Sequence, residues 1–109
     1  MIAHIAGIAC VTPLGCDPAE VRRRIDRGER AALVEMKNPE SGRTFCAAPV
    51  PQEYVAHVNR EPRLRRASTI SLLAAAAGRT AIADARLDVS PAVKSRLALV
   101  LGVSSGGVQ

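Results

Sequence analysis

The stretch IAHIAGIACVTPLG, residues 2–15, decides the fold class. Residues 2–11 are apolar at nearly every position rather than at alternate positions, a pattern typical of a strand buried on both faces in a parallel sheet. The tetrapeptide TPLG of residues 12–15 marks a turn. We therefore expect a buried strand over residues 2–11, closed by this turn.

A short helix is expected next, over residues 17–28. Asp17 can cap it, Pro18 suits its first turn, and Glu20 stands three residues after Asp17, as in a capping box. Gly28 can end the helix in the left-handed conformation.

The chain is basic, because 15 Lys and Arg residues face 10 Asp and Glu residues and leave a net charge of +5. Such a surplus of positive charge is compatible with binding to phosphates or to an acidic partner protein. On the first helix, however, Glu20 can pair with Arg24 and Arg22 with Asp26 at i,i+4 spacing, which favours a solvated face for residues 22–24. With one Tyr and one Phe there is no platform on which bases could stack, so no nucleic-acid partner is expected.

The middle of the chain is irregular and is followed by a long helix. Residues 37–62 are interrupted by prolines, and residues 44–48 are expected to form a short edge strand ending at Pro49. The long helix is predicted over residues 64–85, where Gly78 in its interior suggests tight packing.

A second fully apolar strand is expected at residues 96–101, with the glycine-rich loop 102–107 behind it. Two buried strands joined by helices predict the α/β class, with parallel strands connected by right-handed helical crossovers. Two strands cannot shield both faces of such a sheet, so residues 1–109 are expected to form one incomplete layer of a larger domain.

Three segments together resemble one enzyme family. They are IAGIACVTPLG at residues 5–15, LLAAAA continuing to AIADARLD at residues 72–88, and LVLGVSSGG at residues 99–107. In this order and spacing they resemble the "TG-G-VTPLG", "ALxDAGLD" and "GVVLGTGxGG" patterns of the β-ketoacyl synthases, the condensing enzymes of fatty-acid and polyketide synthesis. The resemblance covers nearly the whole chain.

The resemblance implies a thiolase-like α/β fold and a parent activity of decarboxylative condensation between an acyl thioester and a malonyl thioester on acyl carrier protein. It also implies a homodimer or heterodimer of the complete domain. The family's nucleophilic cysteine and its histidines lie beyond the segment matched here. The chain is therefore expected to be a truncated N-terminal portion, inactive alone, with no catalytic, cofactor or metal residue of its own.

Two departures from the family pattern have physical consequences. Arg22 stands where the first helix usually has an aromatic residue, and Arg86 replaces the Gly of "DAGLD". A side chain in the left-handed conformation at Arg86 is expected either to be strained by about 1 kcal/mol or to force another geometry at the end of the helix. These departures fit a divergent or specialised-pathway synthase.

None of the cysteines is predicted to be a nucleophile. Cys10 lies in an apolar strand, where the thiol pKa rises, Cys16 is next to a carboxylate, and Cys46 has no base nearby in sequence. His4 is expected half-buried at a strand edge, and His57 solvated.

The cysteines and the N-terminus also bear on location. Without CxxC spacing the three cysteines indicate neither a disulfide framework nor a zinc site, and a reducing cytoplasm is expected. The apolar N-terminus lacks the basic residues of a signal peptide, and no stretch reaches the ~20 apolar residues of a membrane span.

Two other functions are compatible with the sequence. The chain could be a non-catalytic scaffold or partner that binds acyl carrier protein through its arginine-rich helix, since carrier proteins are acidic. Alternatively, residues 102–106 match the G-x-S-x-G elbow of serine hydrolases, with Ser104 as nucleophile, although no acid or His follows Ser104 to complete a triad.

Overall fold

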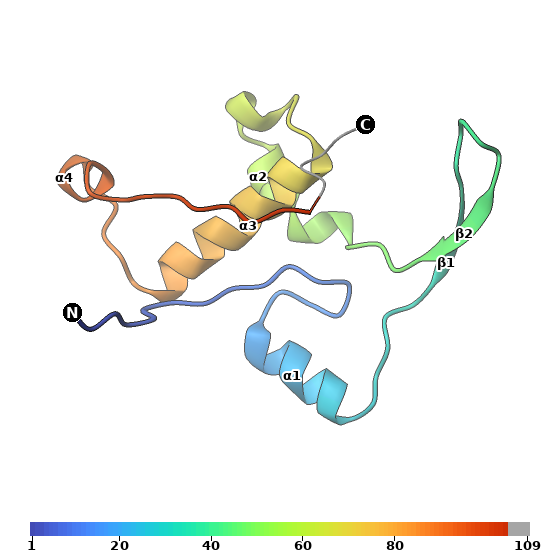
Figure 1. Ribbon diagram of the computed structural model, residues 1–109, viewed down its shortest axis with the longest axis horizontal. Coiled ribbons are helices and arrows are strands. Elements are labelled where there is room, and N and C mark those ends of the chain that lie inside the picture. The colour runs from blue at the N-terminus through green and yellow to red at the C-terminus, as the bar shows by residue number, and fades with distance from the viewer. Residues whose placement is uncertain (105–109) are drawn as a thin grey trace.

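The longest helix, α3, forms the centre of the molecule, and the other elements are arranged around it (Figure 1). The computed structural model describes residues 1–104. In chain order the elements are α1 (Pro18–Asp26), β1 (Val34–Lys37), β2 (Thr44–Ala47), the 3-10 turn η1 (Gln52–Tyr54), α2 (Ala56–Asn59), the 3-10 turn η2 (Pro62–Leu64), α3 (Thr69–Asp84) and α4 (Pro91–Lys94).

Helix α1 forms where the sequence predicts it. The Asp17 carboxylate accepts a hydrogen bond from the Ala19 N–H at 3.2 Å and so caps the first turn. Gly28 follows the helix with a φ of 75°, the left-handed conformation expected at its end. The capping box is only half formed, because the Glu20 carboxylate accepts from Arg23 at 2.7 Å instead.

Helix α3 is shorter than predicted and starts at Thr69 rather than near residue 64. Ser68 is its N-cap, and its side chain accepts a hydrogen bond from the Ser71 N–H at 3.4 Å. The preceding residues turn as η2, which begins at Pro62. The cap explains the later start, since an N-cap residue has a non-helical backbone and breaks any helix running into it.

Helix α4 occupies the turn expected at residues 90–91. Ser90 caps it by accepting from the Val93 N–H at 3.4 Å, and Pro91 is its first residue.

The described residues contain one sheet, an antiparallel hairpin that projects from the helices (Figure 1). Strand β2 confirms the short strand expected at residues 44–48, whereas its partner β1 was not predicted. The turn between them is fixed by Asn38, whose side-chain oxygen accepts from the Glu40 and Ser41 N–H groups at 2.8 and 3.0 Å.

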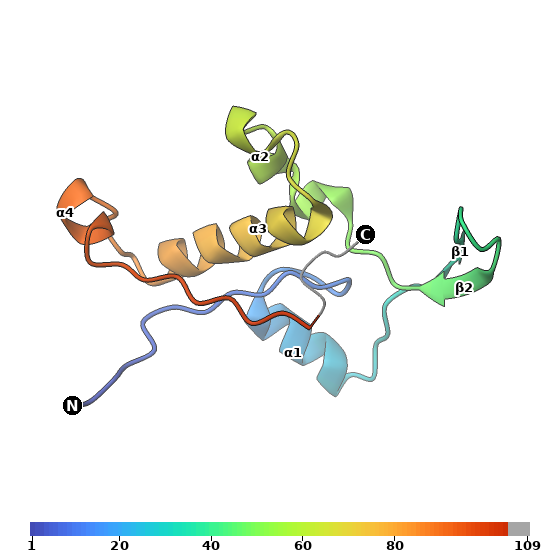
Figure 2. The same cartoon turned by 45° about the horizontal axis from the view of Figure 1, so that its top comes forward.

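The two strands predicted at residues 2–11 and 96–101 are not formed within the described chain. We call residues 2–11 the N-terminal apolar segment and residues 96–103 the C-terminal apolar segment. Both run alongside α3 without regular secondary structure (Figure 2). Strand formation requires a hydrogen-bonded neighbour, and neither segment has one among residues 1–104. The parallel sheet with helical crossovers stays a prediction.

The core is small. Among the described residues, three apolar side chains are buried, namely Val55, Val58 and Ala76, with Val11 and Leu73 among those packed against them. The chain exposes 9221 Å², against roughly 5,800 Å² for a folded monomer of this size. Its radius of gyration is 16.6 Å, whereas about 13 Å is typical of a compact domain of this length.

The most exposed large apolar side chains between residues 2 and 104 lie on the two apolar segments. Ile2, Ile5, Leu99 and Val100 are each more than four-fifths exposed. Large exposed apolar patches are uncommon on monomeric proteins and often mark interaction surfaces.

Candidate functional site

Two of the segments that carry the family resemblance contact each other at the end of α3. A Cβ atom placed on Gly7 would lie 2.6 Å from the Ala85 N atom and 2.8 Å from the Ala85 Cβ atom, and it would also meet the Ala81 carbonyl. The Ile8 N–H donates to the Asp84 carboxylate at 2.9 Å. The missing side chain at Gly7 therefore allows the N-terminal apolar segment to approach α3 at a distance that no other residue permits.

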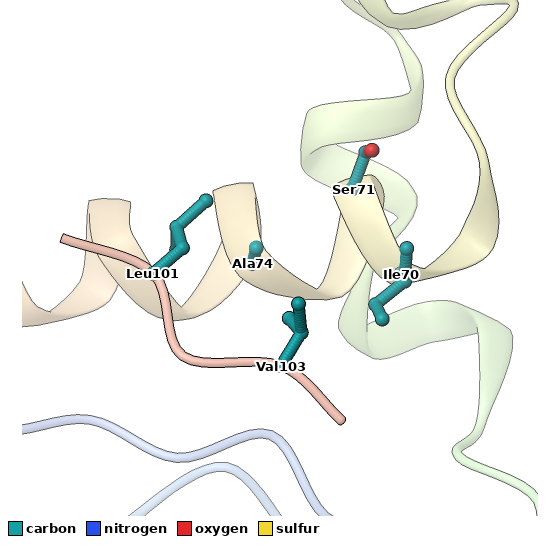
Figure 3. A pocket seen from close by; sticks show the side chains of 5 residues that line it. All are labelled: Ile70, Ser71, Ala74, Leu101 and Val103. Atoms are coloured by element: carbon teal, nitrogen blue, oxygen red, sulfur yellow. The ribbon is translucent and has the colours of Figure 1, made fainter. Parts of the chain in front are cut away.

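The third segment lies against the same helix. Leu101 and Val103 face Ile70 and Ala74 of α3 across a groove of about 200 Å³ (Figure 3). A second groove of about 400 Å³ extends along α3 and is lined by Leu99 and Leu101. All three segments that carry the resemblance are therefore assembled around α3.

The side chains that line the two grooves are mainly apolar and include few reactive groups. Their polar side chains are those of Ser71 and Arg79, and Arg79 is held by Glu61 with 3.2 Å between nitrogen and oxygen. A groove with this lining can bind apolar groups, but it brings together no acid, base and nucleophile.

The end of α3 shows the strain expected from the sequence. Arg86 has a φ of 51°, and it is the one non-glycine residue of the described chain with a positive φ. This is the position where the family pattern has Gly, which adopts this conformation without the steric cost of a Cβ atom.

The cysteine environments disfavour thiolates at two positions. Partial burial, and after it the charge of Asp17, raises the pKa of the Cys10 thiol. Partial burial raises the pKa of the Cys16 thiol as well, followed by the charges of Cys10 and Glu53. The direction agrees with the sequence prediction, but at Cys16 burial acts rather than the adjacent carboxylate. Cys46 is exposed on β2.

The histidines and Ser104 do not converge on a site. His57 is exposed on α2, as expected, but His4 is exposed too, because the predicted strand edge that would half-bury it is not formed. Ser104 is exposed, and no side-chain hydrogen bond to it is found within residues 1–104. Residues 105 and 106 of the G-x-S-x-G match lie outside the described residues.

The arginines of α1 are engaged within the helix and its immediate neighbourhood. Arg22 pairs with Asp26 at 3.2 Å, and Arg23 and Arg24 both pair with Glu20, at 2.7 and 3.2 Å. Hydrogen bonds from these two arginines lower the pKa of the Glu20 carboxyl group. The predicted pairs at i,i+4 spacing are confirmed, and the solvated-face interpretation fits them.

A second basic surface was not predicted from the sequence as a binding surface. It lies between α2 and α3 and consists of Arg60, Arg63, Arg65 and Arg66, which are all exposed. No carboxylate within residues 1–104 lies within 4.0 Å of any of them, and the nearby Glu61 is held by Arg79. Four arginines within seven residues are a visible signal in the sequence, and the structure leaves them unneutralised. We call them the inter-helix arginine cluster.

Within residues 1–104, no three His, Cys, Asp or Glu side chains are grouped closely enough to hold a metal ion. The helices of this part of the chain are too short or too polar to cross a bilayer.

With this geometry established, comparison with known proteins adds no relative: no family model, curated protein or solved structure matches the sequence. The functional argument therefore rests on the residues themselves.

Proposed function

We propose that this chain is the N-terminal scaffold segment of a β-ketoacyl synthase-like domain of fatty-acid or polyketide biosynthesis. The parent reaction would be decarboxylative condensation of acyl and malonyl thioesters on acyl carrier protein. The observation that carries the proposal is the contact of Gly7 and Ile8 with Ala85 and Asp84, since residues of two resembling segments, far apart in sequence, meet there.

The reactive groups support a scaffold rather than a complete enzyme. Condensation needs a thiol of lowered pKa and donors for the charge that develops on the substrate. Burial raises the pKa of Cys10 and Cys16, which is the opposite direction. The three cysteines are free thiols, which favours a reducing cytoplasm as the location.

The exposed apolar segments support an incomplete layer. Residues 2–8 and 97–103 carry the most exposed of the large apolar side chains between residues 2 and 104, and they flank the same helix. In the proposal these two segments become neighbouring strands when the remainder of a thiolase-like layer supplies the missing hydrogen-bonding partners.

Fragment complementation tests the scaffold role. The chain would be co-expressed with the C-terminal part of a β-ketoacyl synthase that carries the cysteine and the histidines but lacks its own N-terminal segment. We expect the two polypeptides to co-elute and condensation to depend on both. Gly7→Val should abolish the effect, whereas Gly78→Ala, which meets nothing within 4 Å, should retain it. Separate elution of the two polypeptides would contradict the proposal.

A second candidate function, binding of an acidic carrier protein, is favoured by the inter-helix arginine cluster. The sequence suggested residues 22–24 as the binding surface, but these arginines already have carboxylate partners. The cluster at Arg60, Arg63, Arg65 and Arg66 has none within residues 1–104 and keeps its charge available.

Two triple variants separate the surfaces. Replacing Arg63, Arg65 and Arg66 with Gln should weaken carrier binding and flatten its dependence on salt. Replacing residues 22–24 with Gln is the matched control and should leave binding nearly unchanged. Equal binding by the wild type and the first variant would exclude this function for the cluster.

A further inference from the structure

The β1–β2 hairpin has one apolar and one polar face. Val34 lies opposite Ala47 and Met36 opposite Phe45, so these four side chains share a face. Glu35 and Lys37 lie on the other face. Val34, Met36 and Phe45 are each almost half exposed, at 45%, 45% and 47%. A two-stranded hairpin with an uncovered apolar face is marginally stable by itself.

The outer edge of β1 carries free backbone groups at two defined residues. The Asn38 N–H donates to the Arg43 carbonyl at 2.8 Å, so Asn38 and Arg43 form a hydrogen-bonded pair. Such pairs alternate in an antiparallel ladder, which turns the backbone groups of Val34 and Met36 toward β2. The N–H and C=O groups of Glu35 and Lys37 therefore point outward.

The same two residues carry opposite charges that have no ion-pair partner in the part of the chain that the structure describes. No ion pair within 4.0 Å involves Glu35 or Lys37 among residues 1–104. Charged side chains on an edge strand normally discourage pairing with another chain. They favour it only in a register that places opposite charges side by side.

We propose that β1 pairs antiparallel with β1 of a second copy of this chain, about a two-fold axis at Met36. In this register Glu35 lies opposite Lys37 of the second copy, and Lys37 lies opposite its Glu35. The two-fold axis therefore creates two equivalent pairs of opposite charge. Because the outward backbone groups belong to the same two residues, the register also forms four backbone hydrogen bonds. A shift of the register by one residue would lose both the charge pairs and the backbone hydrogen bonds.

The neighbouring sequence limits the length of the ladder. Pro39 is the next residue whose N–H would point outward, and proline has none to donate. The product is a four-stranded sheet in which Met36 meets its own copy and the apolar faces of the two hairpins become continuous. Its small size predicts a weak, concentration-dependent dimer.

Disulfide trapping tests the register directly. Cys10, Cys16 and Cys46 are first replaced with Ser in the full chain. In a Met36→Cys variant, the two Cα atoms across the axis would lie about 4.5 Å apart, within reach of a disulfide. In the matched Val34→Cys control they would lie about 14 Å apart, at about 3.4 Å per residue. We expect the first variant to form a covalent dimer on mild oxidation and the control to remain monomeric.

Charge reversal provides a second, independent test by analytical ultracentrifugation. Glu35→Lys should lose the concentration-dependent dimer, because two lysines would then face each other, and adding Lys37→Glu should restore it. Glu40→Lys changes the net charge equally but lies in the turn outside the ladder, and it should leave the dimer intact. Equal trapping of both cysteine variants, or a double variant that fails to recover the dimer, would overturn the proposal.

The tests of the β1–β1 dimer do not depend on the proposed scaffold role. The hairpin contributes none of the contacts between α3 and the apolar segments that carry that proposal, so either can fail without the other.

Discussion

The contact between Gly7 and the end of α3 makes a quantitative prediction for Gly7→Ala. The added methyl group would lie 2.6 Å from the Ala85 N atom and 2.8 Å from the Ala85 Cβ atom. The atoms that it meets are largely helix backbone and cannot rotate away. Overpacking of this kind costs about 1–3 kcal/mol.

A second loss follows if the segment lifts from the helix. The hydrogen bond from the Ile8 N–H to Asp84, 2.9 Å long, would be broken, at a cost of about 1 kcal/mol. The combined destabilisation is about 2–4 kcal/mol, or a fall of about 1–2 M in the urea midpoint at a slope near 2 kcal/mol per M. Circular dichroism of the helices measures the midpoint, and amide exchange of Ile8 reports the local opening.

Gly78→Ala is the control, because it makes the same substitution at a glycine of α3, the helix whose end Gly7 contacts. A Cβ atom there meets nothing within 4 Å, and the sequence-based expectation of tight packing at Gly78 is therefore wrong. Alanine in a helix interior should stabilise the chain by about 0.5–1 kcal/mol. If Gly7→Ala changed neither the midpoint nor the exchange rate of Ile8, the contact that carries the scaffold proposal would be refuted.

Further predictions concern the end of α3, the charges of α1 and the thiols. Arg86→Gly should raise the free energy of unfolding by about 1 kcal/mol, measured by thermal melting, because it relieves a φ of 51°; a lower melting temperature would show that the Arg86 side chain contributes more than its strain costs. Hydrogen bonds from arginines lower the pKa of Glu20, so the stabilisation that Glu20 gives α1 is complete above the unfolded pKa and is lost as pH falls through the lower folded value. The Cα chemical shifts of α1 across pH 2–6, a range around the ordinary pKa of about 4.3, should show this loss. Glu20→Gln should remove this pH dependence. Because burial raises the pKa of Cys10 and Cys16, both should react with iodoacetamide at pH 8 more slowly than free glutathione; faster reaction by either thiol would contradict the environments described.

Local signals in the sequence predicted α1 and most of α3, but neither α2 nor α4. Asp17 and Gly28 define the ends of α1, and both act through short-range geometry that neighbouring residues determine. The left-handed conformation at Arg86 is one of the two outcomes expected where Arg replaces the Gly of the family pattern, and it is the one observed. Strand β1 could have been found from the alternation of apolar and polar residues over 34–37.

Features that depend on distant partners were not predicted. Residues 2–11 and 96–101 have the composition of buried strands, but strands need hydrogen-bonded neighbours that residues 1–104 do not supply. The close approach of the backbone occurs at Gly7 rather than Gly78, because it depends on which surface of α3 is covered. The composition of a segment indicates neither its hydrogen-bonded neighbours nor which surface of a helix is covered.

The intact mass of the chain after incubation with labelled acyl carrier protein tests the central claim most directly. A scaffold segment without its own nucleophile should show no added mass, while a complete synthase run in parallel becomes acylated. A stable acyl adduct on Cys10, Cys16 or Cys46 would contradict the account.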